Sequence, residues 1–151
     1  MTAAVTGGHH RTGGSRCRSD SVDLAAHPAV VAQARLRSRL ALRDWGIEGI
    51  AEETAQIVSE IVTNAVTATR AAGLSTGIRL ALTADESGVL VAVWDGAPAM
   101  PVQASPDLDS ESGRGLLLVD ALAEWHDVRV VPEGHGGGKL VRAKVAIPRS
   151  Q

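Results

Sequence analysis

The fold is decided by residues 59–66, whose sequence is SEIVTNAV. This stretch lies in the middle of a longer segment with apolar residues at the spacing of one helix face. We expect that helix to run from Glu48 to Ala72 and to end at Gly73, because glycine readily adopts the conformation that closes a helix. Its buried stripe comprises Ile50, Thr54, Ile57, Ile61 and Ala65, with Val58, Val62 and Val66 beside it.

Two polar residues interrupt the apolar pattern of this helix. Glu60 and Asn64 are four positions apart and project from the same face. Asn costs about half a kcal/mol relative to Ala inside a helix, so its amide needs a partner. A phosphate-bound magnesium ion, reached through the amide oxygen, is one candidate, and Glu60 could then act as a base toward a hydroxyl or water. The alternative is a surface Glu beside an Asn that is hydrogen-bonded to nearby backbone. When these two residues are considered without the other motifs, this alternative is favoured.

Periodicity also predicts the neighbouring elements. A preceding helix covers 28–44 and stops at Gly46. Alternating apolar residues predict a strand over 77–84, and a more apolar strand follows over 89–94. The turn formers of residues 85–88 join the two strands into a hairpin.

The C-terminal third contains a long loop followed by a helix and two strands. The loop covers 95–112, and an aperiodic loop of this length in a compact domain is usually functional. A helix from Gly113 to Glu124, a strand over 125–131 and a last strand over 139–147 follow. The element order predicts a two-layer α/β sandwich, with helices packed on one face of a mixed, mainly antiparallel sheet.

The N-terminal residues differ in composition from the rest. Residues 1–20 are rich in Gly, Ser, Thr, Arg and His, and such a segment buries too little surface to order itself. We therefore expect a disordered N-terminal tail over 1–20, whose basic character has no assigned role. A single domain over 21–151 follows, opening with a short strand near 22–26.

The composition excludes several classes of protein. A net charge of -2 gives no sign of a nucleic-acid or membrane partner. The single cysteine, Cys17, rules out an intramolecular disulfide and a multi-cysteine metal site. No signal peptide is recognisable, and no apolar run reaches the roughly 18 residues of a membrane span. We expect a cytoplasmic protein.

Two further segments carry residues suited to a nucleotide. Asp95-Gly96 ends an apolar strand, where a carboxylate can accept a hydrogen bond from an exocyclic amine such as that of adenine; an ordinary turn is the alternative. Gly113-Arg114-Gly115-Leu116 opens a helix, where backbone amides and the helix dipole favour an anion. A plain loop-to-helix junction is the alternative there. No Gly-Lys-Ser/Thr follows, so the segment is not a Walker A motif.

In this order the segments resemble the histidine-kinase-like ATPase domain (the Bergerat-type ATP-binding fold) of sensor kinases and DNA gyrase. The similarity is greatest to the anti-sigma factor and serine/threonine kinase branch of actinobacterial type. It extends over roughly residues 28 to 147. Residues 59–66 resemble the N box of that family, 93–98 with Pro101 its first glycine box, 113–116 with Val119, Leu122 and Trp125 its second, and 138–143 its last box.

The resemblance implies a role for each matching residue. Asn64 would hold Mg2+, Glu60 would be the general base, and Asp95, followed by Gly96, would bind the adenine amine of ATP. Residues 100–115 would form a lid over the nucleotide. Gly113, Arg114, Gly115 and Leu116 would face the phosphates. Proteins of this branch bind a sigma factor, and many phosphorylate an anti-anti-sigma protein on serine or threonine; some form homodimers.

The sequence departs from the family pattern at four positions. Ala97 stands where glycine is frequent, Ala68 where His is common, and Arg142 where Trp is frequent. Leu140 stands where a Thr hydroxyl commonly assists the adenine-binding Asp. Losing that bond would remove about 1 kcal/mol and weaken ATP binding about fivefold.

Three functions are therefore open. The first is an ATP-dependent anti-sigma factor with serine/threonine kinase activity toward an anti-anti-sigma partner. The second is a non-catalytic protein-binding module of the same fold, with weak or no ATP binding. The third, a stand-alone ATP domain of a histidine kinase, is disfavoured because His27 lacks a long coiled-coil context.

Overall fold

The fold comes from a computed structural model that describes residues 5–6, 17–98 and 111–149. The side chains of residues 5–6 and 111–116 are outside this description. The lid expected over 100–115 lies largely outside the described residues, as does Pro101.

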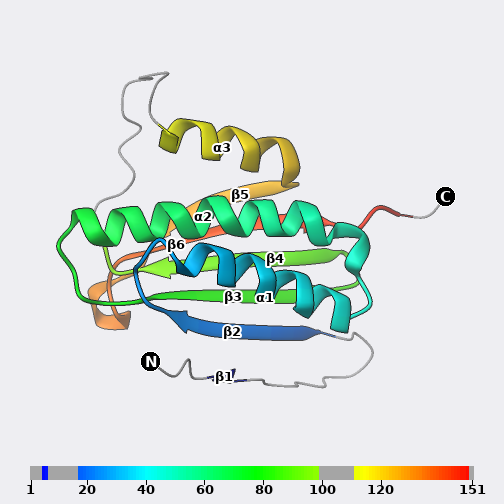
Figure 1. The fold of residues 1–151 in the computed structure, drawn as a ribbon, viewed down its shortest axis with the longest axis horizontal. Coiled ribbons are helices and arrows are strands. Elements are labelled where there is room, and N and C mark those ends of the chain that lie inside the picture. Colours follow the sequence, from blue (N-terminus) through cyan, green and yellow to red (C-terminus); the bar gives the residue numbers. More distant parts are fainter. Residues whose placement is uncertain (1–4, 7–16, 99–110, 150–151) are drawn as a thin grey trace.

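One antiparallel sheet forms one layer of the molecule (Figure 1). Its strand order is β1-β2-β3-β4-β6-β5, and each pairing between described strands is antiparallel. The two-layer α/β sandwich is therefore confirmed, and these pairings show no parallel component of the kind a mixed sheet has. The strands are β1 (Val5–Thr6), β2 (Arg18–Leu24), β3 (Ile78–Asp85), β4 (Gly88–Asp95), β5 (Trp125–Val130) and β6 (Lys139–Ala146).

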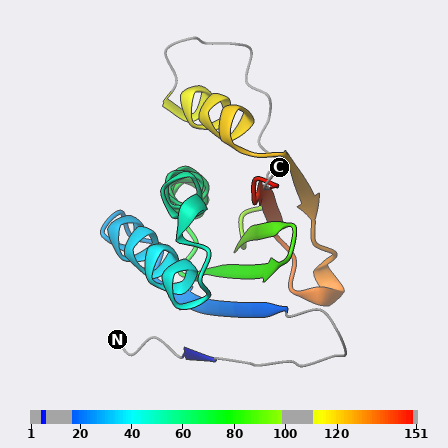
Figure 2. The ribbon, with the colours of Figure 1, turned by 90° about the vertical axis from the view of Figure 1, so that its right-hand side faces the viewer.

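Three helices form the other layer. They are α1 (Val30–Asp44), α2 (Ala51–Ala71) and α3 (Glu111–Leu122), and a single 3-10 turn, η1 (Glu48–Ile50), leads into α2. Figure 2 shows α2 between α1 and α3, and α2 contacts both of its neighbours as well as β4. The long helix predicted from the sequence thus forms the centre of the helical layer.

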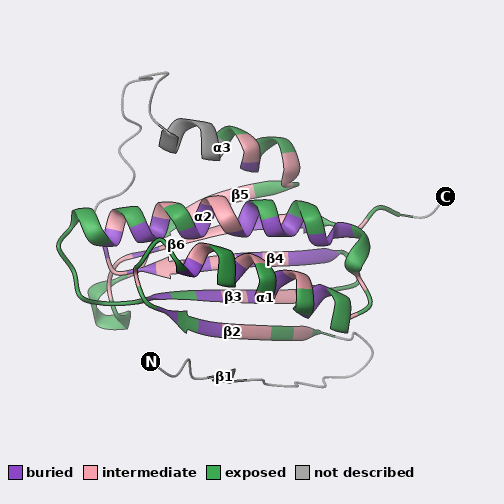
Figure 3. Ribbon diagram, viewed as in Figure 1, coloured by how far each residue is buried: buried purple, intermediate pink, exposed green. Residues whose placement is uncertain are grey.

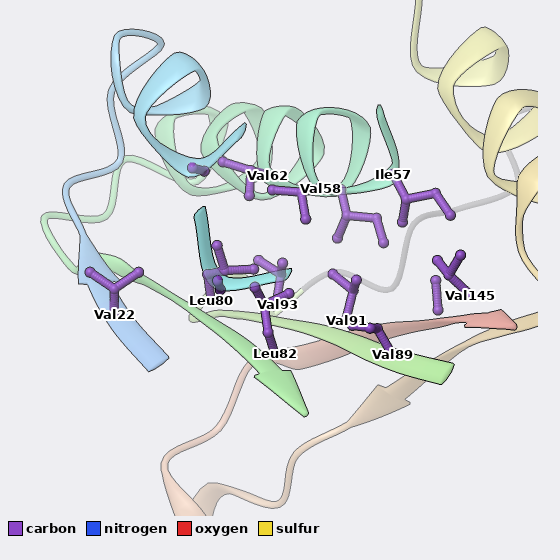
Figure 4. Close-up of a cluster of buried hydrophobic side chains, with 14 of the residues drawn as sticks. Val22, Ile57, Val58, Val62, Leu80, Leu82, Val89, Val91, Val93 and Val145 are labelled. Carbon is purple, nitrogen blue, oxygen red and sulfur yellow. The ribbon is translucent and has the colours of Figure 1, made fainter. Parts of the chain in front are cut away.

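The core lies between α2 and the sheet (Figure 4). Alternate residues of β3 and β4 point toward the helices, and the apolar stripe of α2 meets them. Burial on α2 is confined to the side that faces the sheet (Figure 3). The largest fully buried side chains are Leu42, Ile57, Ile61, Ile78, Leu80, Leu82 and six valines, namely Val58, Val62, Val89, Val91, Val93 and Val119.

Glycines end both long helices, as the sequence predicts. Gly46 has a φ of 74° and Gly73 a φ of 67°, the left-handed conformation that closes a helix. After α1, the Gly46 amide donates to the Arg43 carbonyl and the Ile47 amide to that of Leu42. The same pair of bonds follows α2, so the last carbonyls of each helix are satisfied.

Several boundaries differ from the sequence-based expectation. Strand β2 begins at Arg18 and ends at Leu24, whereas a strand near 22–26 was expected. The polar residues Arg18, Ser19 and Asp20, assigned to the tail, pair with β3. Helix α1 begins at Val30 rather than at Pro28.

No helix within the described ranges is both long enough and apolar enough to serve as a membrane span.

Candidate functional site

The centre of the candidate site is Asp95, the last residue of β4. It faces the helical layer, and its side chain is 1% exposed. Its Oδ1 atom accepts hydrogen bonds from the Ala97 amide and from the Lys139 ammonium, both at 2.9 Å. Among the described residues, Oδ2 has no partner, although it is buried. A buried carboxylate oxygen without a donor is costly, so this atom is an acceptor poised for a ligand donor.

Lys139 reaches Asp95 because of the strand register. Asp95 of β4 pairs with Lys139, the first residue of β6, and both residues face the helices. The Lys139 side chain is 8% exposed, so the ion pair is buried on both sides. Lysine is rarely buried unless it is paired. The pair is therefore a built feature of the site rather than a surface contact.

Gly138 brings the two strand ends together. A Cβ at Gly138 would lie 2.0 Å from the Asp95 carbonyl oxygen and 2.8 Å from the Gly96 Cα. No side chain fits at that approach. Its φ of 78° also lies in the left-handed region. The glycine that precedes Lys139 thus allows the β6 backbone to lie directly against the Asp95-Gly96 turn.

The role expected for Leu140 is wrong. Leu140 pairs with Trp94, and because successive residues of a strand face opposite sides, its side chain lies on the face of the sheet away from Asp95. The residue that donates to Asp95 is Lys139. Leu140 therefore removes no hydrogen bond from Asp95. The fivefold loss of ATP affinity attributed to it does not follow.

Glu60 and Asn64 form one flank of α2 that turns away from the α1 side, Asn64 further than Glu60. On the other flank, Glu52 forms an ion pair with Arg39 of α1, which marks the α1 side of the helix. At 100° per residue, Asn64 lies about 120° around the axis from Glu52. Glu60 and Asn64 are both half-buried, and no hydrogen bond or ion pair joins either side chain to another described residue.

Ala68 continues the stripe of Glu60 and Asn64 at the same four-residue spacing and is also half-buried. His is common at this position in the family, and Ala68 instead adds no polar group to this flank of α2.

Helix α3 begins at Glu111, two residues before the expected start. Gly113 therefore lies in the first helical turn and Gly115 in the second, rather than in a loop. The side chains of Arg114 and Leu116 are outside the described residues. The N-terminal end of α3, the C-terminal end of β4 and the last turns of α2 lie toward the same side of the molecule, on the left of Figure 1.

The opposite face of the sheet carries a separate set of contacts. Arg142, found where Trp is frequent, donates to Asp127 across 2.9 Å and lies 5.2 Å from the ring centre of Trp125. Its hydrogen bonds and positive charge hold the pKa of Asp127 below its usual value. Arg142 therefore braces β5 against β6 and stands apart from Asp95.

An open depression of about 430 Å³ also lies on this opposite face. Its lining includes Asp23, Arg79, Trp94 and His135. The Trp94 indole donates to the Gly137 carbonyl at 2.9 Å, which fastens the 132–138 turn to β4. The depression is thus separated from Asp95 by the sheet.

A comparison with protein-family models finds one match, to the histidine kinase-like ATPase domain, over residues 24–144. The match includes α1, α2, Asp95 and Lys139, and it covers most of the chain. The chain belongs to this family. No curated protein matches it. The histidine-kinase-like ATPase domain is a nucleotide-binding domain, and the matched residues include the polar elements around Asp95.

The residues present fit a 6-aminopurine nucleotide. Oδ2 of Asp95 has no hydrogen-bond donor in the described part of the chain, and an exocyclic amine could supply one. The described residues contain no cluster of three or more His, Cys, Asp or Glu able to hold a metal ion by itself. A magnesium ion here would rely on the nucleotide's phosphates together with Asn64, which is how Mg2+ is commonly held.

The burial of Lys139 and its pairing with Asp95 were not predicted from the sequence. A signal was present, because a lysine opens an otherwise apolar strand directly after three glycines, Gly136 to Gly138. A charged residue at the start of a strand usually lies in solvent, and only the register with β4 shows that this one is buried.

Proposed function

We propose that this protein is an ATP-binding anti-sigma factor with serine/threonine kinase activity toward an anti-anti-sigma partner. The observation that supports it most is the buried, unpaired Oδ2 atom of Asp95, an acceptor suited to the adenine amine. The family membership supports nucleotide binding, and the Glu60–Asn64 flank of α2 adds the groups that phosphoryl transfer requires.

Each residue has a definite task under this proposal. Asp95 accepts a hydrogen bond from the base, with Gly96 at the turn beside it. The Asn64 amide oxygen holds Mg2+, and the amides of Gly113 and its helical neighbours attract the phosphates through the dipole of α3. Glu60 accepts the proton of the partner's serine or threonine hydroxyl. When bound, ATP supplies the phosphoryl group.

Replacing Asn64 by Ala tests the catalytic part of the proposal. We expect Asn64→Ala to lose Mg2+-dependent ATP binding and phosphorylation of a partner. Asn64 makes no side-chain hydrogen bond to another described residue, and Ala favours a helix by about half a kcal/mol. The free energy of unfolding is therefore expected to stay level or rise by that amount. The measurements are isothermal titration with Mg2+ and ATP, transfer from radiolabelled ATP, and urea unfolding.

Thr63→Ala is a matched control in the same helix. Thr63 is exposed, and its hydroxyl donates to the Ser59 carbonyl. This variant should bind and transfer as the wild type does. Wild-type protein that binds Mg2+ and ATP but transfers no phosphate to any candidate partner would reduce the function to a non-catalytic module. Undiminished binding and transfer in Asn64→Ala would remove Asn64 from the site.

A further inference from the structure

Lys139 and Asp95 form an ion pair in which one carboxylate oxygen is hydrogen-bonded and the other has no partner among the described residues. The Lys139 ammonium and the Ala97 amide both donate to Oδ1 of Asp95 at 2.9 Å. Oδ2 is buried and unpaired among the described residues. The two donors fix the plane of the carboxylate, because both bonds are directional. Within the described part of the chain, the Oδ2 side of Asp95 therefore has a single acceptor and no donor.

We propose that Lys139 is the positioning residue that makes the site selective for a 6-aminopurine over a 6-oxopurine nucleotide. This inference rests on the proposed function. The Lys139 ammonium donates to Oδ1, so what Asp95 presents at Oδ2 is a carboxylate oxygen that accepts hydrogen bonds. An amino group at the purine 6-position donates to Oδ2. A 6-oxo group, as in guanine, would place a second acceptor against a buried acceptor, and a site built in this way rejects the mismatched analogue strongly.

The geometry of lysine matters as much as its charge. An ammonium is a compact point charge and engages one oxygen, whereas the planar guanidinium of arginine tends to donate to both oxygens of a carboxylate. Lys139 contacts only Oδ1. Arginine at position 139 would retain the ion pair but occupy Oδ2, the atom that the base needs.

This contrast separates a positioning role from a purely structural one. If Lys139 only neutralised a buried charge, Lys139→Arg would bind ATP as well as the wild type does. Under the proposal, Lys139→Arg keeps the fold but binds ATP at least about tenfold more weakly. Lys139→Met removes one of the two donors that hold Oδ1 and frees the carboxylate to rotate. It should weaken ATP binding and reduce the preference for ATP over GTP by about tenfold or more.

Lys144→Met is the matched control. Lys144 lies on the same strand, but its ammonium contacts Ser87 and Asp85 at the β3–β4 hairpin rather than the site. It should leave both nucleotide affinities unchanged. Lys139→Met and Lys144→Met make the same substitution on the same strand. A difference in nucleotide affinity between them therefore reports the effect of position 139 alone.

The experiment measures the binding of ATP and of GTP to each variant by isothermal titration, alongside urea unfolding without nucleotide. A cycle of Asp95→Asn, Lys139→Met and the double variant gives the coupling of the pair from unfolding alone. If Lys139→Met does not fold, Lys139→Arg decides the question. An ATP affinity and an ATP-to-GTP ratio unchanged in a folded Lys139 variant would overturn this inference while leaving the proposed function intact. A wild type that binds neither nucleotide would overturn the proposed function itself.

Discussion

At the scale of single residues, two glycines with similar backbones have different tasks. Gly73 and Gly138 have φ values of 67° and 78°, both left-handed. A Cβ at Gly73 would meet nothing within 4 Å, whereas one at Gly138 would lie 2.0 Å from the Asp95 carbonyl oxygen. Gly73 therefore serves the conformation alone. Gly138 serves the conformation and the close approach that aligns Lys139 with Asp95.

Substitution by alanine at both glycines tests this difference. We expect Gly73→Ala to cost about 1–2 kcal/mol of unfolding free energy, the usual penalty for an L-residue in the left-handed region. Gly138→Ala adds a backbone clash of a kind that typically costs a further 1–3 kcal/mol or so. It should also weaken ATP binding, because the Asp95 turn must move. The measurements are urea unfolding and nucleotide titration; equal losses in the two variants would contradict the assignment.

At the scale of elements, the β3–β4 hairpin is fixed by the side chain of Asp85. Its Oδ1 accepts from the Ser87 hydroxyl at 2.6 Å, from the Ser87 amide at 2.8 Å and from the Gly88 amide at 3.2 Å. These bonds, those from Ser87 above all, lower the pKa of Asp85 from 3.8 to about 2. Asp85 thus closes the two-residue turn between two central strands of the sheet.

This pKa predicts a pH-dependent contribution to stability. Because the folded pKa lies below the ordinary value of 3.8, the contribution is fully present above about pH 4 and is lost as the pH falls toward 2. Half of the Asp85 side chain is exposed, so solvent screening reduces the electrostatic part. Asp85→Ala should cost about 1 kcal/mol at pH 7.

Urea unfolding of the wild type and Asp85→Ala between pH 2 and 7 checks this. The difference in unfolding free energy between the two proteins should shrink as the pH falls below about 4. Asp85→Asn keeps an acceptor oxygen without the charge. At pH 7 its unfolding free energy should lie between those of the wild type and Asp85→Ala. A difference that is constant from pH 7 to 2 would contradict the role of the ionised carboxylate.

Helix α2 shows how much an element can be predicted from its own sequence. Its extent and buried stripe followed from apolar spacing, because a helix that covers a sheet buries one face along its whole length. The positions of Glu60 and Asn64 on a single face followed too. The neighbour that this face meets could not be predicted, because it depends on how α1 and α3 pack. In the structure, the Arg39–Glu52 ion pair identifies the α1 side of the helix.

At the scale of the whole molecule, the features that sequence reasoning missed depend on long-range pairing. Arg18 to Asp20 look like part of a polar tail, yet they pair with β3 more than sixty residues later, and Asp20 receives two hydrogen bonds from Arg37 of α1. The link between Lys139 and Asp95 likewise needs the β4–β6 register. A one-residue difference in register exchanges the two faces of a strand, so only this register shows that Lys139, and not its neighbour Leu140, meets Asp95.

Nucleotide binding should be visible in the stability of the whole domain. A ligand that binds only the folded state at 100 times its dissociation constant adds about 2.7 kcal/mol. For a domain of this size that corresponds to a rise in Tm of roughly 5–11 °C. We expect this rise with Mg2+ and ATP, measured by calorimetry or by fluorescence of the tryptophans.

Two controls connect that rise to Asp95. Asp95→Asn replaces one of the two acceptor oxygens by an NH2 group, which can only donate. Either the amine of the base or the Lys139 ammonium then loses its acceptor. Its Tm should change little when ATP is added. GTP at the same concentration should also fail to raise the Tm of the wild type. A full rise with GTP, or with ATP in Asp95→Asn, would mean that the base is recognised somewhere other than at the buried end of β4.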